Sequence, residues 1–234
     1  MKVFNSLFSF TPICDRIRKN RKGAYFIKTC IIVCAGGFDG LIEPIQEGDL
    51  LLAADGGFSH LLKLGLTPHG ILGDFDSLGY VPKDAKIFPK EKDDTDSMLC
   101  VRHGLKQGYR RFMLYGTLDG PRLDHTLANL QTLQFLADHG ATGYLIGSRY
   151  IATVVKNGCV RFPETATGII SVFCMGKDAI GVTLEGLHYR LENGTLSAGF
   201  PLGVSNHFIG KNAAICVDDG SLLLLYDREN GLPI

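Results

Sequence analysis

Residues 70–77 read Gly70-Ile71-Leu72-Gly73-Asp74-Phe75-Asp76-Ser77. A short apolar run that ends in glycine and two aspartates is typical of a buried strand with polar side chains at its carboxyl end. Comparable runs, each ending at glycine or at aspartate and glycine, occupy residues 29–35, 50–54, 111–115 and 143–146. Helical periodicity lies between them, over 58–65, 94–105 and 126–139. This alternation predicts an α/β domain with a parallel sheet, which we place at residues 29–150.

Beyond residue 150 the chain changes to short β-type runs, at 151–155, 168–174, 181–184, 213–217 and 221–226. Three triplets lie beside or between these runs: Lys156-Asn157-Gly158, Glu192-Asn193-Gly194 and Asp218-Asp219-Gly220. Asn-Gly and Asp-Gly are typical of hairpin turns. We therefore expect a second, smaller domain at residues 151–234, an antiparallel β-sandwich.

The overall charge is balanced, with 24 basic and 24 acidic residues among 234. This balance gives no sign of nucleic-acid or anionic-membrane binding. Mean hydropathy is only slightly positive, and no apolar run approaches the roughly 20 residues that a spanning helix needs. Residues 1–28 are basic, and we expect them to form a solvated extension or an extra helix.

Seven cysteines are scattered through the chain without a CxxC pair. Several lie in apolar runs, as Cys30 and Cys34 do. Free thiols in a reducing compartment explain this pattern, so we expect a cytoplasmic protein without a zinc site.

Aspartates gather where strands are expected to end. In the extended stretch Asp74-Phe75-Asp76 the two carboxylates point to the same side, because side chains alternate along a strand. Converging carboxylates repel one another, and Mg²⁺ is the usual remedy because it binds carboxylates together with substrate phosphates. Neighbouring glycines let a phosphate approach the backbone. The pattern therefore indicates metal-assisted phosphoryl chemistry.

Each motif has a simpler interpretation when taken alone. Asp55-Gly56-Gly57 is a common type of turn, and Asp94 or Thr95 would serve as a helix cap. Asp124 would favour the start of a helix, and His125 is typical of a packed polar edge. Residues 73–77 resist such an explanation, since two acids around a phenylalanine are unusual in a surface turn. The motifs together, each at a strand exit or a helix start, favour a site. Neither a GxGxxG fingerprint nor a Walker lysine motif is present, which excludes a dinucleotide site and a P-loop kinase of those types.

The order of these motifs resembles the thiamine pyrophosphokinase family over about residues 30–226. The residues that carry the resemblance are Ala54-Asp55-Gly56-Gly57, Gly73-Asp74-Phe75-Asp76-Ser77, Lys92-Asp93-Asp94-Thr95-Asp96, Arg122-Leu123-Asp124-His125 with Asn129, and Gly203-Val204-Ser205-Asn206. The resemblance implies an α/β nucleotide-binding domain followed by a β-sandwich that binds thiamine. It also implies a homodimer with active sites between its subunits.

The resemblance further implies roles for individual residues. Asp74, Asp76 and Asp96 would hold Mg²⁺ and the nucleotide phosphates, with Asp124 completing the catalytic set. The nucleotide side would comprise Asp55, Gly56, Gly57, Ser77, Lys92, Thr95, Arg122 and Asn129. Thiamine would meet Asp96 and Asp124 and, from the β-sandwich, Ser205 and Asn206.

Two positions depart from the family pattern. Pro121 stands in a loop that is usually glycine-rich, and proline has no amide hydrogen to donate to a phosphate. His207 stands where the family often carries an acid. Both departures concern substrate contacts and leave the acidic motifs intact.

The expected reaction is transfer of pyrophosphate from ATP to the hydroxyl of thiamine, giving thiamine diphosphate and AMP. Two alternatives stay open at this point. A metal-dependent nucleotide phosphohydrolase would share the acidic motifs, and a non-catalytic nucleotide or thiamine sensor would share the ligand sites. A sensor would have no need for the full set of Asp74, Asp76, Asp96 and Asp124.

Overall fold

The structure is a computed structural model that describes residues 17–19, 25–74, 80, 86–87 and 94–234. Part of the basic N-terminal segment is extended: β1 (Ile17–Lys19) pairs antiparallel with β2 (Tyr25–Ile27). The expectation of an extra helix is therefore wrong for these residues. Within the described part of the chain, no helix is long and apolar enough to cross a membrane.

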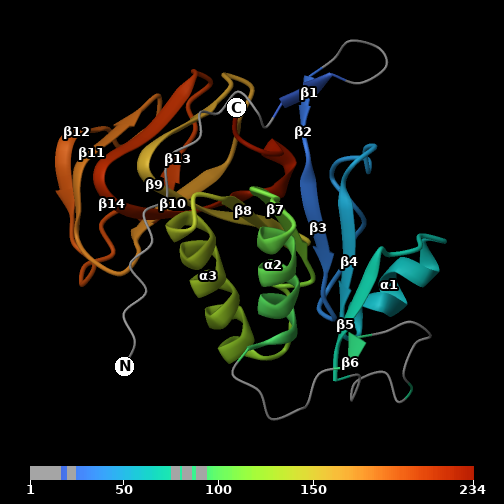
Figure 1. The fold of residues 1–234 in the computed structure, drawn as a ribbon. Helices are drawn as coiled ribbons and strands as arrows, with labels where there is room; N and C mark the ends of the chain where they lie inside the picture. The colour runs from blue at the N-terminus through green and yellow to red at the C-terminus, as the bar shows by residue number, and fades with distance from the viewer. Residues whose placement is uncertain (1–16, 20–24, 75–79, 81–85, 88–93) are drawn as a thin grey trace.

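The N-terminal half contains six strands that lie side by side in the order β8-β7-β3-β4-β5-β6 (Figure 1). They are β3 (Thr29–Val33), β4 (Leu50–Ala54), β5 (Gly70–Gly73), β6 (Lys86–Ile87), β7 (Arg111–Tyr115) and β8 (Thr142–Ile146). Every neighbouring pair among them is parallel. The carboxyl ends of these strands therefore meet at one edge of the sheet, where ligands bind in folds of this kind.

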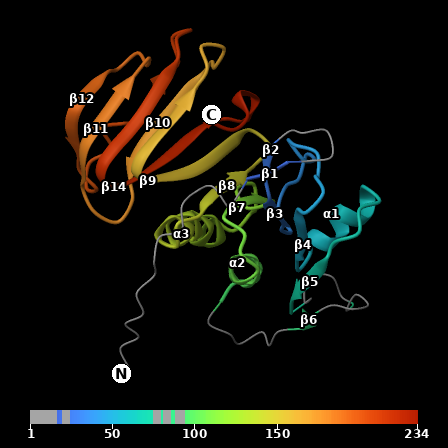
Figure 2. The ribbon, with the colours of Figure 1, turned by 45° about the horizontal axis from the view of Figure 1, so that its top comes forward.

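In the described part of the chain, three helices cover the two faces of this sheet. They are α1 (Gly57–Lys63), α2 (Asp96–Lys106) and α3 (Leu123–Asp138). On one face, α2 and α3 lie beside each other (Figures 1 and 2) and their apolar residues pack on Cys30 and Ile32 of β3. On the other face, Leu61 of α1 packs on Ile31 and Val33. Alternate side chains of β3 thus pack into the two hydrophobic cores on opposite faces of the sheet.

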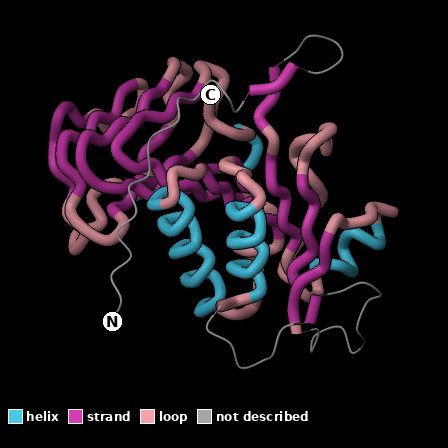
Figure 3. The backbone as a smooth tube through the Cα atoms, viewed as in Figure 1, coloured by secondary structure: helices cyan, strands magenta, loops and turns pink. Residues whose placement is uncertain are grey.

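The regular secondary structure of the C-terminal half is almost all antiparallel strand, joined by loops (Figure 3). The strands are β9 (Tyr150–Phe162), β10 (Ile169–Cys174), β11 (Ala179–Glu185), β12 (Leu191–Leu196), β13 (Asn206–His207) and β14 (Ala213–Asp227), followed by a 3₁₀ turn at Arg228–Asn230. β9 pairs antiparallel with β8, so one sheet continues from the parallel half into the antiparallel half.

The three triplets that predicted hairpins lie inside strands instead. Asn157 falls within β9, Asn193 within β12 and Gly220 within β14, each with positive φ, and the pairing register shifts beside them. Asparagine and glycine favour positive φ at bulges as well as at turns, which explains the wrong prediction.

One bulge divides the two longest strands. Before it, residues 150–156 of β9 pair with 221–227 of β14; after it, residues 158–162 pair with 213–217. The later part of β14 also pairs with β10, and its earlier part pairs with β11. β9 and β14 therefore have different neighbours on the two sides of the bulge: β8 and β10 on one side, and β11 on the other.

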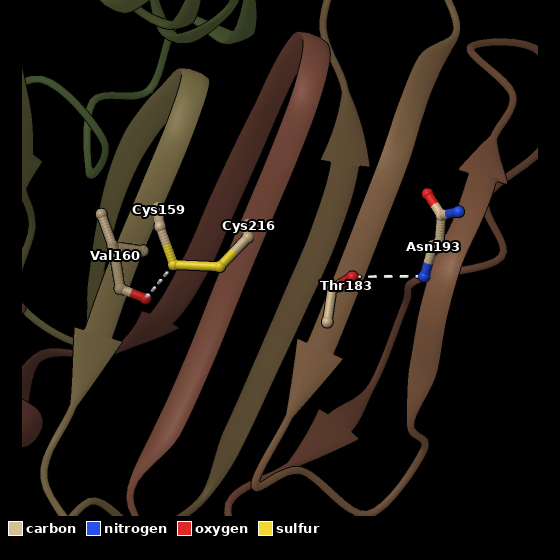
Figure 4. The surroundings of a disulfide bond; sticks show 5 residues. All are labelled: Cys159, Val160, Thr183, Asn193 and Cys216. Atoms are coloured by element: carbon tan, nitrogen blue, oxygen red, sulfur yellow. Dashed lines mark hydrogen bonds between the residues drawn. A yellow bond between two sulfur atoms is a disulfide. The ribbon is translucent and has the colours of Figure 1, made fainter.

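A disulfide links Cys159 of β9 to Cys216 of β14 (Figure 4). The two residues are direct partners in the antiparallel register, with Cα atoms 4.1 Å apart. The expectation of free thiols is therefore wrong for this pair, because the register brings two outward-facing cysteines together. Cys30, Cys34 and Cys174 carry free thiols.

Candidate active site

Three aspartates converge at the carboxyl edge of the parallel strands. Asp55 follows β4, Asp74 follows β5, and Asp96 begins α2. One carboxylate oxygen from each lies within 4.8 Å of the other two, and all three side chains are partly buried. Since close carboxylates repel one another, this arrangement favours a bound divalent cation.

Glycines bring Asp55 to this position. Asp55 has a left-handed φ of 46°, a conformation that aspartate tolerates, and its amide donates to the carbonyl oxygen of Leu72 over 2.8 Å. A Cβ on Gly73 would lie 3.1 Å from the Cα of Asp55, and a Cβ on Gly57 would lie 1.9 Å from the carbonyl oxygen of Val33. The Asp-Gly-Gly motif is therefore a tightly packed junction between strand and helix.

Thr95 fixes the first turn of α2. Its backbone is extended, and its hydroxyl oxygen accepts a hydrogen bond from the amide of Met98 over 3.2 Å. This is the capping role that the sequence alone suggested as an alternative for Thr95. Because Asp96 follows the cap directly, the same bond orients the backbone that carries this carboxylate.

The loop after β7 lies against the loop after β3. Gly116 has a φ of 68°, and a Cβ there would come within 2.5 Å of the carbonyl oxygen of Cys34. The amide of Gly36 donates to the carbonyl oxygen of Gly116 over 3.1 Å. Only glycines permit this approach of two backbones, which forms one wall of the site.

A cavity of about 470 Å³ opens beside the aspartates. The residues that line it include Cys34, Gly36, Asp55, Asp96, Arg122 and His125. Its size suits a ligand larger than a single phosphate. The cavity joins residues from four segments that lie far apart in the sequence.

Cys34 is a lining residue that the sequence analysis left among the packing thiols. Burial, with smaller contributions from Asp96 and Asp55, raises the pKa of the Cys34 thiol to about 12. The thiol is therefore neutral and a poor nucleophile at physiological pH. The signal that could have placed Cys34 in the site is its position directly after β3, at the same edge as the aspartates.

Arg122 and Asp124 form an exposed ion pair at the start of α3. The Arg122 Nε donates to Asp124 Oδ1 over 3.2 Å. The hydrogen bonds from Arg122 are the main reason that the pKa of Asp124 is lowered, and the same contact raises the pKa of Arg122. Arg122 lines the cavity, so a guanidinium and its paired carboxylate stand at its mouth.

Asn129 lies deeper, on α3, with 8% of its surface exposed. Its Oδ1 accepts from the Ser97 hydroxyl over 3.1 Å, and its Nδ2 donates to the carbonyl oxygen of Thr117 over 3.0 Å. The sequence-based role of Asn129 on the nucleotide side stays a prediction, because both polar atoms of its side chain have protein partners.

A second cavity, of about 480 Å³, lies in the antiparallel half and shares no lining residue with the first. Ser205 and Asn206 both line it, together with apolar residues such as Leu202 and Val204. Asn206 is buried, and its side chain exchanges two hydrogen bonds with the backbone of Tyr189, at 2.9 and 2.7 Å. Within one chain, Asp96 thus lines the first cavity, whereas Ser205 and Asn206 line the second.

Some predicted site residues lie outside the described part of the chain: Asp76, Ser77 and Lys92. The metal set expected from the sequence was Asp74, Asp76 and Asp96. Asp55, expected on the nucleotide side, occupies the described cluster with Asp74 and Asp96.

Two profiles of one protein family match the chain, one mainly in the parallel half and one in the antiparallel half. The profile of the thiamin pyrophosphokinase catalytic domain matches residues 43–145, and that of the thiamin pyrophosphokinase vitamin B1 binding domain matches residues 159–222. Together the two matches cover more than two thirds of the chain. The chain belongs to the thiamin pyrophosphokinase family.

Individual members of the thiamin pyrophosphokinase family agree with this assignment. Thiamine pyrophosphokinase from Bacillus subtilis is 28% identical over 223 residues, which cover 87% of this chain and 100% of the relative. A crystal structure of that enzyme superposes with a TM-score of 0.74 at 24% identity, over 86% of this chain and 99% of the other. The structure of thiamin pyrophosphokinase from Geobacillus thermodenitrificans gives a TM-score of 0.70 at 26% identity, over 85% and 97%.

The boundaries of the two thiamin pyrophosphokinase matches separate the two cavities. Asp55, Asp74 and Asp96 all fall in the match to the catalytic domain. Ser205 and Asn206 fall in the match to the vitamin B1 binding domain. The acidic cluster and the apolar second cavity thus coincide with the two named parts of the family.

Proposed function

We propose that this protein transfers pyrophosphate from ATP to the hydroxyl of thiamine, releasing AMP and thiamine diphosphate. The observation that carries the proposal is the convergence of Asp55, Asp74 and Asp96 beside a cavity of about 470 Å³, within the region that matches the family's catalytic domain. The parallel half of the molecule is then the nucleotide-binding part.

The three carboxylates fit Mg²⁺, because this ion prefers oxygen ligands and commonly shares them with substrate phosphates. We assign Asp55, Asp74 and Asp96 to the metal, with Asp76 retained from the sequence pattern. When bound, the ion supplies positive charge to the phosphate oxygens. Without such an ion the acidic cluster would repel ATP, so ATP is expected to bind only with the metal in place.

In the reaction, the thiamine hydroxyl oxygen bonds to the β-phosphorus of ATP while the bond from that phosphorus to the α–β bridging oxygen breaks. AMP leaves with that oxygen, and the hydroxyl proton passes to water. Arg122 stands at the cavity mouth, where its guanidinium would stabilise charge on the transferred group. Asp124 has a lowered pKa and is therefore a weak proton acceptor. We assign it to orienting thiamine and to attracting the cationic thiazolium ring.

We further propose a homodimer with composite active sites. The first cavity has two exposed leucines nearby on α3, Leu123 and Leu127, at 71% and 55% exposure. The second cavity is rimmed by exposed Tyr189, Leu202 and Val204. A two-fold arrangement in which the second cavity of one protomer faces the first cavity of its partner would cover both apolar patches. It would also unite the predicted thiamine residues.

A cytoplasmic location stays a prediction. The absence of a spanning helix among the described residues agrees with it. The disulfide between Cys159 and Cys216 disagrees with a cytoplasmic location, since such bonds persist mainly in oxidising compartments.

The deciding experiment incubates the purified chain with thiamine, ATP and Mg²⁺ and separates the products. We expect thiamine diphosphate and AMP in equal amounts, and neither in the presence of a chelator. Asp96→Asn should reduce the rate by at least about a hundredfold, because it removes a charge from the metal set. Asp138→Asn, an exposed change at the far end of α3, is the matched control and should keep the wild-type rate.

The same assay separates the alternatives. ATP consumption that does not require thiamine would favour the nucleotide phosphohydrolase. Binding of ATP or thiamine without any turnover would favour the sensor. Either result would overturn the proposed transfer reaction.

A further inference from the structure

A chain of buried hydrogen bonds runs behind the acidic cluster. The Ser97 hydroxyl donates to Asn129 Oδ1 over 3.1 Å, and Asn129 Nδ2 donates to the carbonyl oxygen of Thr117 over 3.0 Å. Ser97, Asn129 and Thr117 are exposed by 8%, 8% and 3%. These hydrogen bonds are therefore shielded from water. A polar group that lost its partner here would have no water molecule to replace it.

A donor and an acceptor can be assigned in each hydrogen bond of this series. The Thr95 and Ser97 hydroxyl oxygens lie 3.0 Å apart. Since the Ser97 hydrogen is directed to Asn129, the Thr95 hydroxyl donates to Ser97. The Thr95 oxygen still accepts from the amide of Met98 at the start of α2. Each hydroxyl thus donates once and accepts once, as a hydroxyl can.

These hydrogen bonds connect the start of α2, the loop after β7 and helix α3. Thr95 and Ser97 flank Asp96, one of the three aspartates of the cluster. Thr117 belongs to the loop that begins at Gly116 and reaches Arg122 at the cavity mouth. Asn129 stands between them on α3. The amide therefore ties the first turn of α2, which carries Asp96, to the loop after β7.

We infer that Asn129 is a positioning residue, which acts through Ser97 on Asp96 and through Thr117 on the loop 116–122. This inference rests on the proposed function and deepens it. Asn129 lines the cavity, yet its contribution to the reaction is indirect: it keeps the first turn of α2 and the phosphate-facing loop in one arrangement. Outer groups of this kind typically change metal affinity or activity by about 10–100-fold when removed.

The protein offers matched variants with which to test this inference. Asn129→Leu removes both bonds at similar volume, and Ser97→Ala removes one of them with little change in shape. Ser97→Thr keeps the hydroxyl. Thr132→Val is the control, because Thr132 is equally buried on the same helix but bonds only to the carbonyl oxygen of Ala128, one turn away.

Two measurements are made on each folded full-length variant: Mg²⁺ affinity by calorimetry without substrates, and kcat and KM for pyrophosphate transfer. We expect Asn129→Leu and Ser97→Ala to bind Mg²⁺ at least about tenfold more weakly and to lose kcat. Ser97→Thr and Thr132→Val should stay near wild type in both, even where Thr132→Val lowers the melting temperature.

Two results would overturn the inference. The first is wild-type Mg²⁺ affinity and kcat in Ser97→Ala and in any folded Asn129→Leu, while the wild-type enzyme binds Mg²⁺ and turns over. The second is an equal loss in Thr132→Val, which would mark a general effect of core damage. A wild-type chain that neither binds Mg²⁺ nor transfers pyrophosphate would overturn the proposed function, and this inference with it.

Discussion

Asp124 shows how one neighbour sets the charge of a residue even at the surface. Its pKa is lowered chiefly by hydrogen bonds from Arg122, with a smaller contribution from the charge of that residue. Replacing Arg122 by glutamine removes the cation that favours the ionised carboxyl. The pKa of Asp124 should therefore rise toward the ordinary aspartate value, and the carboxylate should be lost at a higher pH than in wild type.

Carbon NMR titration of the Asp124 carboxyl in wild type and in Arg122→Gln measures this shift directly. Arg161→Gln, which removes a cation from the distant strand β9, serves as the control and should leave the titration unchanged. Identical titration curves for Arg122→Gln and wild type would show that the ion pair does not form in solution.

Gly57 carries the close packing of α1 against β3. Since a Cβ there would lie 1.9 Å from the carbonyl oxygen of Val33, Gly57→Ala must push the helix away from the sheet. We expect the free energy of unfolding to fall by at least about 2 kcal/mol, as in other overpacked sites. Urea unfolding of Gly57→Ala and of Gly199→Ala, where a Cβ would meet nothing within 4 Å, makes the comparison. Equal midpoints would contradict the packing argument.

At the scale of single residues, the positions of the aspartates were predicted from the sequence. The backbone conformations and hydrogen bonds that hold them in place were not. Asp55, Asp74 and Asp96 were found because each follows a strand or begins a helix, and such positions share one edge of a parallel sheet. The inclusion of Asp55 in the acidic cluster depends on a left-handed backbone that is not evident from the residue type. The role of Asn129 depends on hydrogen bonds to Ser97 and Thr117, which lie 32 and 12 positions away.

Among the secondary-structure elements, those with strong periodicity were predicted well. The strands at 50–54 and 111–115 have the predicted bounds, because a continuous apolar run between glycines has few alternatives. The triplets at residues 156–158, 192–194 and 218–220 were misread as turns. Their residue types report positive φ, but whether the chain then reverses or bulges depends on which strands lie beside it.

The bulge in β9 provides a test of this reasoning. Asn157 has a φ of 45°, and its Oδ1 accepts from the amide of Gly220 in β14 over 2.8 Å. Asn157→Ala should lose about 2 kcal/mol of unfolding free energy, from backbone strain and the missing bond together. Asn157→Gly relieves the strain and should lose about half as much. Thermal or urea unfolding gives the order wild type, glycine, alanine; an alanine variant as stable as the glycine variant would refute it.

At the scale of the whole molecule, the proposed homodimer would bring the second cavity of one protomer against the first cavity of its partner. Mixing two inactive variants tests this arrangement. Asp96→Asn disables the first cavity, and Val204→Arg places a cation in the second, where it would repel thiamine. In a mixed dimer with composite sites, one of the two sites has both cavities intact.

Dissociating and reassociating equal amounts of the two variants should therefore restore about a quarter of the wild-type activity, since half of the dimers are mixed and half of their sites are intact. Leu127→Asp should weaken the dimer in sedimentation experiments, whereas Leu62→Asp, an equally exposed leucine on α1, should not. If mixing restored no activity, the active site would not combine the first cavity of one protomer with the second cavity of its partner.

The position of β14 between β9, β10 and β11 has a consequence for synthesis of the protein. The strands of the parallel half have all emerged by residue 146, so that half is free to fold early. β9 and β11 cannot pair with β14 until it has been synthesised. Cys159 and Cys216 are 57 residues apart, which corresponds to roughly 3–11 s at usual translation rates. During that interval the nascent chain exposes unpaired strand edges on the ribosome. Chaperone capacity and translation speed over residues 163–212 are therefore expected to govern how much of the protein reaches the folded state.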